Sequence, residues 1–473
     1  AGVLTLWVGL RLPSRSFVFT ALAVQLLGGA LFLATGPQFS EGGIPLAHGG
    51  FWAPLTLGLA AMVGAWRLQM GDSLGAFEGL SLLRLSQALL VWGAGWWALA
   101  WVIEVLHFAS LPMQATLLLG IAAASVALWT VLAQRLSWPS LGVLCTVLIP
   151  AAALVLLAAW HSRYHPAANF GWLAWAAVFV VHFMSLRRLA PMLPARVLSV
   201  AHVLGCWLLM GVLALQLRYG LLVLSEQYNA WRWLGWAILP SLYLVLMAAP
   251  RAWPWPVSAY SREYRVYAAA PLALLMLGWF WLANVASDGN AEPLPYVPLI
   301  NPLELGLLFA LFGVYVWSRS AMTQLAARKD YTANVTQGVT GASLFVFFTA
   351  LVMRTAHHWS GVPFELDLLL ASMRVQAGLS IVWTLMALSL MIGGHLRCRR
   401  EVWLIGAALI GVVVAKLFFV ELSNRGGLAR IVSFIGVGVL LLVVGYFAPL
   451  PPKRADAVPD TGKPLAESEG VSS

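Results

Sequence analysis

The feature that most constrains this 473-residue chain is the recurrence of apolar runs of about 16 to 21 residues, separated by short polar breaks. The hydrocarbon core of a bilayer is about 30 Å thick, so a helix needs about 20 apolar residues to cross it. Helices also satisfy their own backbone hydrogen bonds, which a lipid environment requires. The sequence therefore predicts an all-α, polytopic membrane protein.

The runs predict about fourteen full transmembrane helices plus a truncated one at residues 1–10, which we expect to be the end of a helix whose beginning is missing. The spans at 303–317 and 338–353 are short, so either is expected to be less tilted or partly re-entrant. Residues 1–450 then form one polytopic transmembrane domain, and residues 451–473 are predicted to be a disordered tail. The full spans are expected at residues 17–36, 51–68, 83–103, 115–133, 139–159, 170–186, 197–217, 231–248, 266–284, 303–317, 338–353, 375–394, 402–420 and 428–447.

The number and placement of charged residues support the membrane-protein class and indicate how the chain is oriented in the membrane. Only 10% of the residues are charged, against about 25% in soluble domains, which excludes an ordinary soluble enzyme and a disordered protein. Of the 28 Lys and Arg residues, 20 fall on one set of alternate loops and the tail, and 8 on the other side. Positive residues collect on the cytoplasmic side, so a cytoplasmic C-terminus is predicted. The net charge of +10 then indicates attraction to anionic membrane lipids, and no nucleic-acid partner is expected.

Charged residues inside spans are functional candidates because lipid disfavours them. Apart from residues within two positions of a span end, no Asp or Glu is expected inside a span, and Lys416 is the only Lys or Arg expected there, close enough to the outer end to extend its amine outward. Transport coupled to an ion usually needs a charged group near the membrane midplane, so this pattern disfavours it. No cofactor is expected.

The main candidate site is the loop after the expected span 338–353, on the outer face. After Pro363, apolar residues recur at Leu366, Leu369, Leu370 and Met373, which predicts a short amphipathic helix starting at the proline. Its two acids and two histidines are possible metal ligands, although a solvated interfacial loop is the favoured interpretation. The candidate residues are Arg354, His357, His358, Glu365, Asp367 and Arg374.

Two further outer segments are secondary candidates. Asn301 and Pro302 are typical of a helix cap and first helical position, which places Glu304 in the first turn. A structural role explains Asn301, and a substrate role for Glu304 remains an alternative. In the second segment, ion pairs that hold a helical hairpin are favoured over a ligand site; its candidates are Lys416, Glu421, Arg425 and Arg430.

Four separated motifs carry a resemblance to a known family. They are LPYVPLINPLEL at 294–305, RTAHHWSGVPF at 354–364, VQAGLSIVWTL at 375–385, and KLFFVELS with ARIVSFIGVG and GYFAPLPP between 416 and 452. In these the chain resembles the C-terminal part of the bacterial domain-of-unknown-function family 2339, whose members look longer at the N-terminus. The resemblance implies a large polytopic protein of the bacterial inner membrane. It implies no catalytic residue.

Three functions compete on this sequence. The first is an envelope protein that handles or organises a lipid or lipid-linked glycan at the outer face, either as an enzyme or as a carrier. The second is a facilitative transporter that is not coupled to an ion. The third is a non-enzymatic scaffold for envelope protein partners. The outer-face gathering of histidines and acids favours the first.

Overall fold

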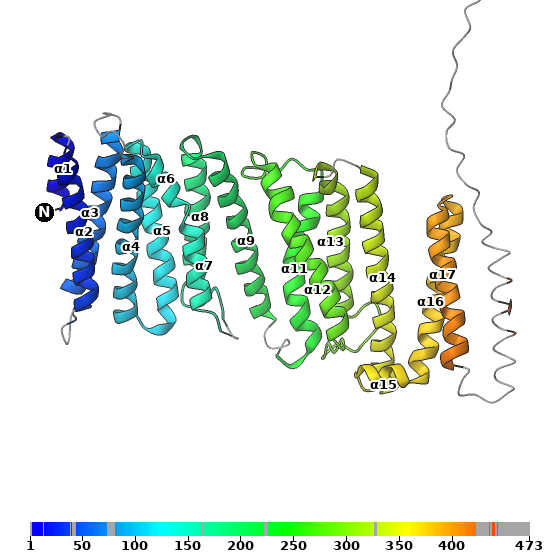
Figure 1. Ribbon diagram of the computed structural model, residues 1–473. Coiled ribbons are helices and arrows are strands. Elements are labelled where there is room, and N and C mark those ends of the chain that lie inside the picture. The colour runs from blue at the N-terminus through cyan, green and yellow to red at the C-terminus, as the bar shows by residue number, and fades with distance from the viewer. Residues whose placement is uncertain are drawn as a thin grey trace, which may run out of the picture. The chain divides into compact units, whose positions relative to one another are not determined.

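A computed structural model describes residues 2–421, except 13, 38, 40–43, 73–80, 162–163, 222–225 and 326–328, together with 435, 438–439 and 442. The described residues form helices joined by short loops and contain no strand (Figure 1). The all-α prediction is therefore confirmed.

The first half of the chain holds α1 to α9, and α11 follows. Their bounds are Gly2–Arg11 (α1), Arg15–Thr35 (α2), Gly49–Asp72 (α3), Leu82–Phe108 (α4), Leu111–Arg135 (α5), Pro139–Cys145 (α6), Leu148–Ala158 (α7), Gly171–Leu189 (α8), the 3-10 turn Ala190–Met192 (η1), Ala195–Gly220 (α9) and Asn229–Ala248 (α11).

The second half begins with a π-helical segment that runs directly into α12. Its elements are Glu263–Ala268 (η2), Ala269–Ala286 (α12), Pro302–Leu325 (α13), Lys329–Ser360 (α14), Leu366–Ala371 (α15), Met373–Leu396 (α16), Arg400–Lys416 (α17) and the π-helical turn Leu417–Glu421 (η3).

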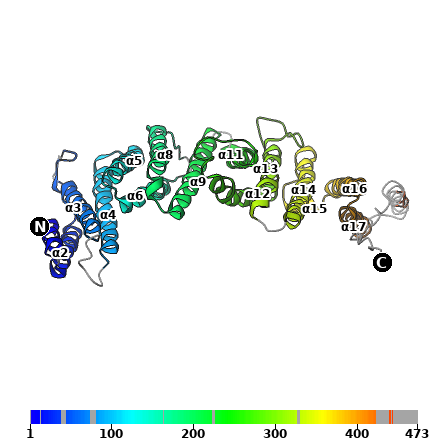
Figure 2. The same ribbon diagram turned by 90° about the horizontal axis from the view of Figure 1, so that it is seen from above.

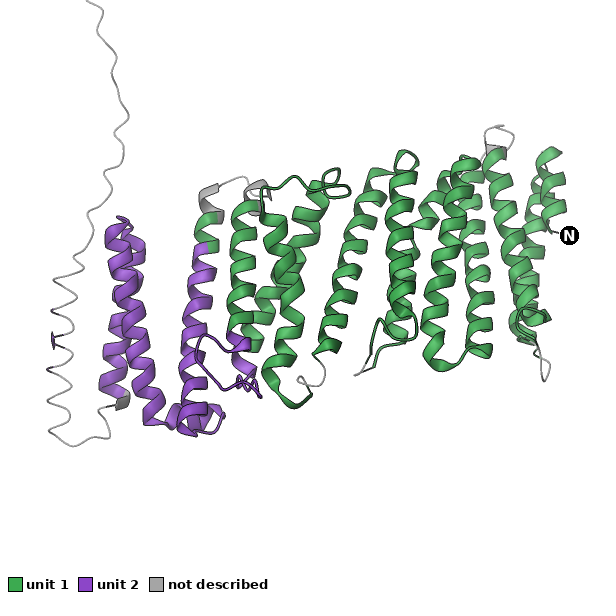
Figure 3. Cartoon of the chain, turned by 180° about the vertical axis from the view of Figure 1, so that it is seen from behind, with its two compact units in different colours: residues 1–283, 305–336 green, residues 284–304, 337–473 purple. Residues whose placement is uncertain are grey.

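The chain divides into two compact units (Figure 3). Unit 1 comprises residues 1–283 and 305–336, and unit 2 comprises residues 284–304 and 337–473. Unit 2 thus takes the last residues of α12, the first residues of α13 and most of α14. The main candidate residues of the sequence all belong to unit 2.

Thirteen helical segments among the described residues are long and apolar enough to cross a membrane. They match the expected spans from 17–36 to 402–420, and the expected span 428–447 and tail 451–473 lie outside the described part apart from a few residues. The run at 139–159 is broken between α6 and α7, because Pro150 has no N–H to pair with the carbonyl of Thr146. The expectation of short or re-entrant spans at 303–317 and 338–353 is wrong, since α13 and α14 have 24 and 32 residues.

The expectation that no acid lies inside a span is also wrong. Glu104 lies in the membrane-length segment 82–108 and Glu304 in 302–320, and their exposed fractions are 5% and 0%. Glu104 lies inside because α4 continues for about a turn beyond the expected span 83–103, whereas Glu304 is already the second residue of the expected span 303–317. Each acid lies within about one turn of a helix end, so the middle of the described spans holds no carboxylate.

Close backbone contact holds α3 against α4 in unit 1, where these helices lie side by side (Figure 2). A Cβ on Gly58 would lie 2.9 Å from the carbonyl oxygen of Gly93, and a Cβ on Gly93 would lie 2.9 Å from that of Gly58. In lipid, van der Waals packing and interhelical hydrogen bonds drive helix association, and small residues allow it. The Ser86 hydroxyl adds such a bond, donating to the Ala65 carbonyl at 2.6 Å.

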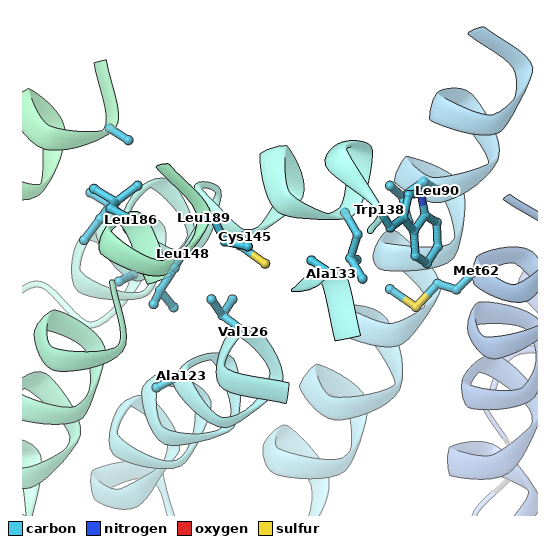
Figure 4. Packing of buried hydrophobic residues seen from close by; sticks show 14 of the residues in the cluster. Met62, Leu90, Ala123, Val126, Ala133, Trp138, Cys145, Leu148, Leu186 and Leu189 are labelled. Atoms are coloured by element: carbon cyan, nitrogen blue, oxygen red, sulfur yellow. The ribbon is translucent and has the colours of Figure 1, made fainter. Parts of the chain in front are cut away.

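The core of unit 1 continues from α4 through α5, α6 and α7 to α8. Figure 4 shows Val126 of α5 with Cys145 and Leu148 of the broken helix and with Leu186 of α8. A buried hydrogen bond of 2.8 Å joins the Thr130 hydroxyl of α5 to the Ser185 hydroxyl of α8. These contacts fix the relative positions of the helices that frame two cavities of unit 1.

Candidate functional site

Arg354 is the centre of the predicted outer-face site, and the structure places it inside α14, not in a loop. Its side chain is 0% exposed. Arg354 Nε donates to Glu304 Oε1 at 3.3 Å, and Nη1 donates to both the carbonyl and the side-chain oxygen of Asn284 at 3.1 Å. The arginine thus joins α14 to the end of α12 and the start of α13. We call these three residues with Tyr296 and Asn301 the Arg354 network.

Glu304 is the counter-charge of this network. Besides Arg354, its carboxylate accepts the Tyr296 hydroxyl at 2.6 Å and the backbone N–H of Leu299. Burial, and then the negative charge of Glu304, raise the pKa of Tyr296, so its phenol stays protonated and donates. The Glu304 carboxylate therefore has three hydrogen-bonding partners, which compensate for burying its charge in a membrane-length helix.

Asn301 caps α13 as the sequence indicated. Its side-chain oxygen accepts the N–H of Leu303 at 2.9 Å, which satisfies one of the free donors of the first helical turn. Its amide also donates to the Gly289 carbonyl at 2.8 Å, so it fixes the loop as well as the helix. Gly289 has a φ of +83°, and a Cβ there would lie 3.0 Å from Arg354 Cδ. The loop 287–301 therefore packs directly on the arginine.

The two adjacent histidines point to different partners. His357 Nδ1 donates to the Val362 carbonyl at 2.7 Å, and His358 Nε2 donates to the Asp288 carbonyl at 3.0 Å. His358 also stacks on Tyr296 with ring centroids 4.3 Å apart. In the part of the chain that the structure describes, no three or more His, Cys, Asp or Glu side chains gather to hold a metal ion. Both histidines instead tie loops to the end of α14.

The acids of the candidate loop and Arg374 are not part of the Arg354 network. Glu365, Asp367 and Arg374 are exposed, and Arg374 donates only to the Ser360 carbonyl, at 3.2 Å. The short helix exists, but it is α15 and begins at Leu366 with Glu365 at the N-cap, so the expected start at Pro363 is wrong. The backbone from Pro363 to Glu365 remains outside the helix and joins α14 to α15.

Lys416 departs from its expected outward orientation. Its amine donates to the Gln376 carbonyl and to the Ser380 hydroxyl of α16, both at 2.7 Å. Acceptors on the neighbouring helix thus replace the water that the amine would reach by extending outward. Glu421 ends η3, but its side chain, like Arg425 and Arg430, lies outside the described residues, so the predicted ion pairs of this hairpin stay predictions.

Sequence reasoning found Arg354, Asn301 and Glu304 but missed Asn284, Tyr296 and Gly289. Asn284 lies at the end of an apolar run, where a capping amide is unremarkable in sequence. The signal for Tyr296 was available, since it lies between two prolines in a segment that the sequence already singled out. Two buried donors of the network, Arg354 Nη2 and Asn284 Nδ2, have no acceptor among the described residues.

The helices and this buried charge network define a polytopic α-helical membrane protein. The chain belongs to domain-of-unknown-function family 2339 (DUF2339), described as a predicted membrane protein, whose model matches residues 1–451. The resemblance seen in the four motifs is thereby confirmed. A search of curated proteins and one of solved structures gave no match to the chain.

Proposed function

We propose that this is a protein of the bacterial inner membrane that handles or organises a lipid or lipid-linked envelope component at its outer, periplasmic face. The 20 to 8 distribution of Lys and Arg supports this orientation, with the C-terminal tail in the cytoplasm. Under this orientation α15 and the Arg354 network lie at the periplasmic end of the helices.

The observation that carries the proposal is the surface of α15. Leu369 packs into unit 2 with an exposed fraction of 3%, while Leu366 remains 64% exposed. Glu365 and Asp367 lie on the same turn as these leucines, and Arg374 begins the next helix. An exposed apolar surface edged by charges is typical of a helix in the membrane interface. Because this surface carries both acidic and basic side chains, it supports contact with lipid headgroups of either charge.

A rigid base holds this surface in place. α15 follows α14 after five residues (Figure 1), and α14 is fixed through Arg354 by a buried ion pair. The Trp359 indole N–H donates to the Tyr296 carbonyl at 3.3 Å and ties the end of α14 to the loop 287–301. A binding surface loses less entropy on ligand binding when it is already ordered, so this arrangement favours a role in recognition.

The experiment is to extract the protein with its surrounding bilayer by a membrane-active polymer and identify the bound molecules by mass spectrometry. The test variant combines Glu365→Gln, Asp367→Asn and Arg374→Gln, all at exposed positions. The matched control combines Glu401→Gln and Arg397→Gln, which are exposed charges at the other end of α16 and α17. A lipid or lipid-linked sugar enriched over the bulk membrane, lost in the test variant and kept in the control, supports the proposal.

Bulk phospholipid in all three preparations would contradict it. If a stoichiometric protein partner were present as well, the scaffold function would replace the lipid function.

A further inference from the structure

A polar pocket of about 510 Å³ lies in unit 1, where the loop 159–171 meets the first turns of α5 and the end of α9. Its polar lining comes from Thr116, His161, Tyr164, His165, Asn169 and Tyr219. We call this space the His161 pocket. By the charge distribution of the loops it lies at the same outer face as α15.

Hydrogen bonds fix the walls of the His161 pocket. Gln216 donates to His165 Nε2 at 3.2 Å and accepts the Ala167 N–H at 3.2 Å, so a neutral His165 carries its proton at Nδ1. His165 also stacks on Tyr219, with ring centroids 3.8 Å apart and planes 4° from parallel. Asn169 donates to the Pro112 carbonyl at 3.2 Å. The pocket is thus formed by ordered side chains from several elements.

The loop backbone is also strained at this point. Asn169 and Phe170 are consecutive residues with φ values of +49° and +62°. Non-glycine residues in this region cost of order 1–3 kcal/mol each, and such strain gathers at binding sites. Here it turns the loop into the pocket just before α8 begins.

An apolar cavity of about 210 Å³ lies beside the same helices, between α4, α5 and the broken pair α6 and α7. Trp97, Trp101, Trp129, Ala151 and Val155 are among its walls. The Trp97 indole N–H donates to the Ser125 hydroxyl at 3.0 Å, whereas the buried Trp101 indole N–H has no acceptor among the described residues. Apart from these two atoms, the lining is largely apolar and suited to a hydrocarbon chain.

The His161 pocket and the apolar cavity are lined by neighbouring residues of the same helices. On α5, Leu118 lines the cavity and Leu119 lines the pocket, while Val155 and Ala159 line the cavity and the pocket one turn, about 6 Å, apart. The cavity follows α5 from Leu118 to Trp129, about 17 Å along the axis. That length is comparable to one leaflet, which is half of the ~30 Å hydrocarbon core.

We propose that unit 1 binds one lipid with a sugar headgroup, with the sugar in the His161 pocket and one chain in the apolar cavity. This inference rests on the proposed function, because it names the class of lipid that the outer face takes.

The headgroup chemistry follows from the lining. The described residues around the pocket include no Asp, Glu, Lys or Arg. The hydroxyl, amide and imidazole groups of this described lining both donate to and accept from sugar hydroxyls. Burial raises the pKa of Tyr164, so its phenol remains a neutral donor. The stacked His165 and Tyr219 add a flat wall for a ring.

The test uses the full chain in nanodiscs of phosphatidylethanolamine and phosphatidylglycerol, with added diglucosyl-diacylglycerol as the probe. Native mass spectrometry counts the probe molecules retained. The wild type should retain one copy, and diacylglycerol without the sugar should not compete for it. Tyr164→Phe combined with His161→Ala should weaken retention by about tenfold or more, the equivalent of one or two good contacts.

Ala151→Phe fills the apolar cavity and should also weaken retention of the probe. Leu154→Phe, on the exposed side of α7, should leave retention unchanged. Equal competition by the sugar-free lipid would overturn the inference, and this arm needs no variant to fold. Wild-type retention in both the Tyr164→Phe/His161→Ala and Ala151→Phe variants would also overturn it.

Failure of this site is separable from failure of the proposed function. The variant that neutralises Glu365, Asp367 and Arg374 reports on the surface of α15 alone, with its own control. Loss of a native lipid in that variant, with no effect of the pocket substitutions, would keep the proposed function and reject this site.

Discussion

Arg354 and Glu304 offer the sharpest test of the account of unit 2, through a double-mutant cycle. The two single changes are Arg354→Met and Glu304→Gln, and the third protein carries both. Each single change leaves one charge buried at 0% exposure without its counter-charge. The double variant holds no buried charge at this site. Its glutamine oxygen can accept from only one of the two donors, the Tyr296 hydroxyl and the Leu299 N–H, which bond different oxygens of Glu304; the same bond is lost in the Glu304→Gln single variant and cancels in the cycle.

The magnitudes follow from these contacts. Breaking a buried pair by removing one partner costs about 3–5 kcal/mol, so the two single changes together predict about 6–10 kcal/mol. The double variant mainly leaves the two oxygens of Asn284 unpaired, at about 1–3 kcal/mol per buried polar group. The cycle should therefore show a coupling of about 3 kcal/mol or more. An exposed ion pair would couple by only about 0–1 kcal/mol.

The assay is equilibrium unfolding in mixed micelles of increasing sodium dodecyl sulfate, followed by tryptophan fluorescence. Arg374→Met is the control, because this arginine is exposed and bonds only a backbone carbonyl. It should change the free energy of unfolding by no more than about 0.5 kcal/mol. Additive effects of the two single changes would show that Arg354 and Glu304 do not form a buried pair, and would refute the description of the network.

Three further substitutions test local geometry by the same unfolding assay. Asn301→Ala removes both the cap and the loop hydrogen bond and should destabilise by about 2 kcal/mol; an unchanged midpoint would contradict the cap. Gly289→Ala must accommodate a positive φ and a Cβ 3.0 Å from the Arg354 side chain, so a loss of at least about 1 kcal/mol is expected. Gly93→Ala places a Cβ 2.9 Å from a backbone oxygen of α3 and should cost about 1–3 kcal/mol. Gly120→Ala is the control for Gly93→Ala: open space surrounds Gly120, so this change should leave the free energy of unfolding unchanged. Equal effects of Gly93→Ala and Gly120→Ala would refute the close contact of α3 and α4.

Membrane class and the placing of spans could be predicted from the sequence because hydrophobic length is a local property. The apolar run before Arg354 ends where the polar side chains begin, yet α14 continues to Ser360. Arg354 can lie fully buried in this helix because Glu304, 50 residues earlier in the chain, neutralises its charge. Apolar periodicity contains no information on such a partner, so the length of α14 was underestimated.

The candidate site also combines features set by neighbouring residues with features set by residues far apart in the chain. Asn301 was predicted correctly as a cap because a cap needs only the next two residues. The roles of Asn284 and Tyr296 depend on how α12, α13 and α14 meet, and the pocket at His161 depends on how α5, α8 and α9 meet. The sequence placed the acids of α15 and the arginine in one site, whereas the structure buries the arginine and leaves the acids exposed.

Under the proposed orientation α15 and the His161 pocket face the outside of the cell, and cysteine labelling can test this. Native Cys398 is exposed and lies at the predicted cytoplasmic end of α16, while Cys145 and Cys206 are buried. Asp367→Cys and His161→Cys place a thiol at each proposed outer site. Intact spheroplasts would be treated with a membrane-impermeant maleimide, before and after the membrane is opened. If this orientation is correct, both new thiols react in intact spheroplasts and Cys398 reacts only after the membrane is opened. Reaction of Cys398 in intact spheroplasts, with both new thiols protected, would reverse the orientation and contradict the proposed function.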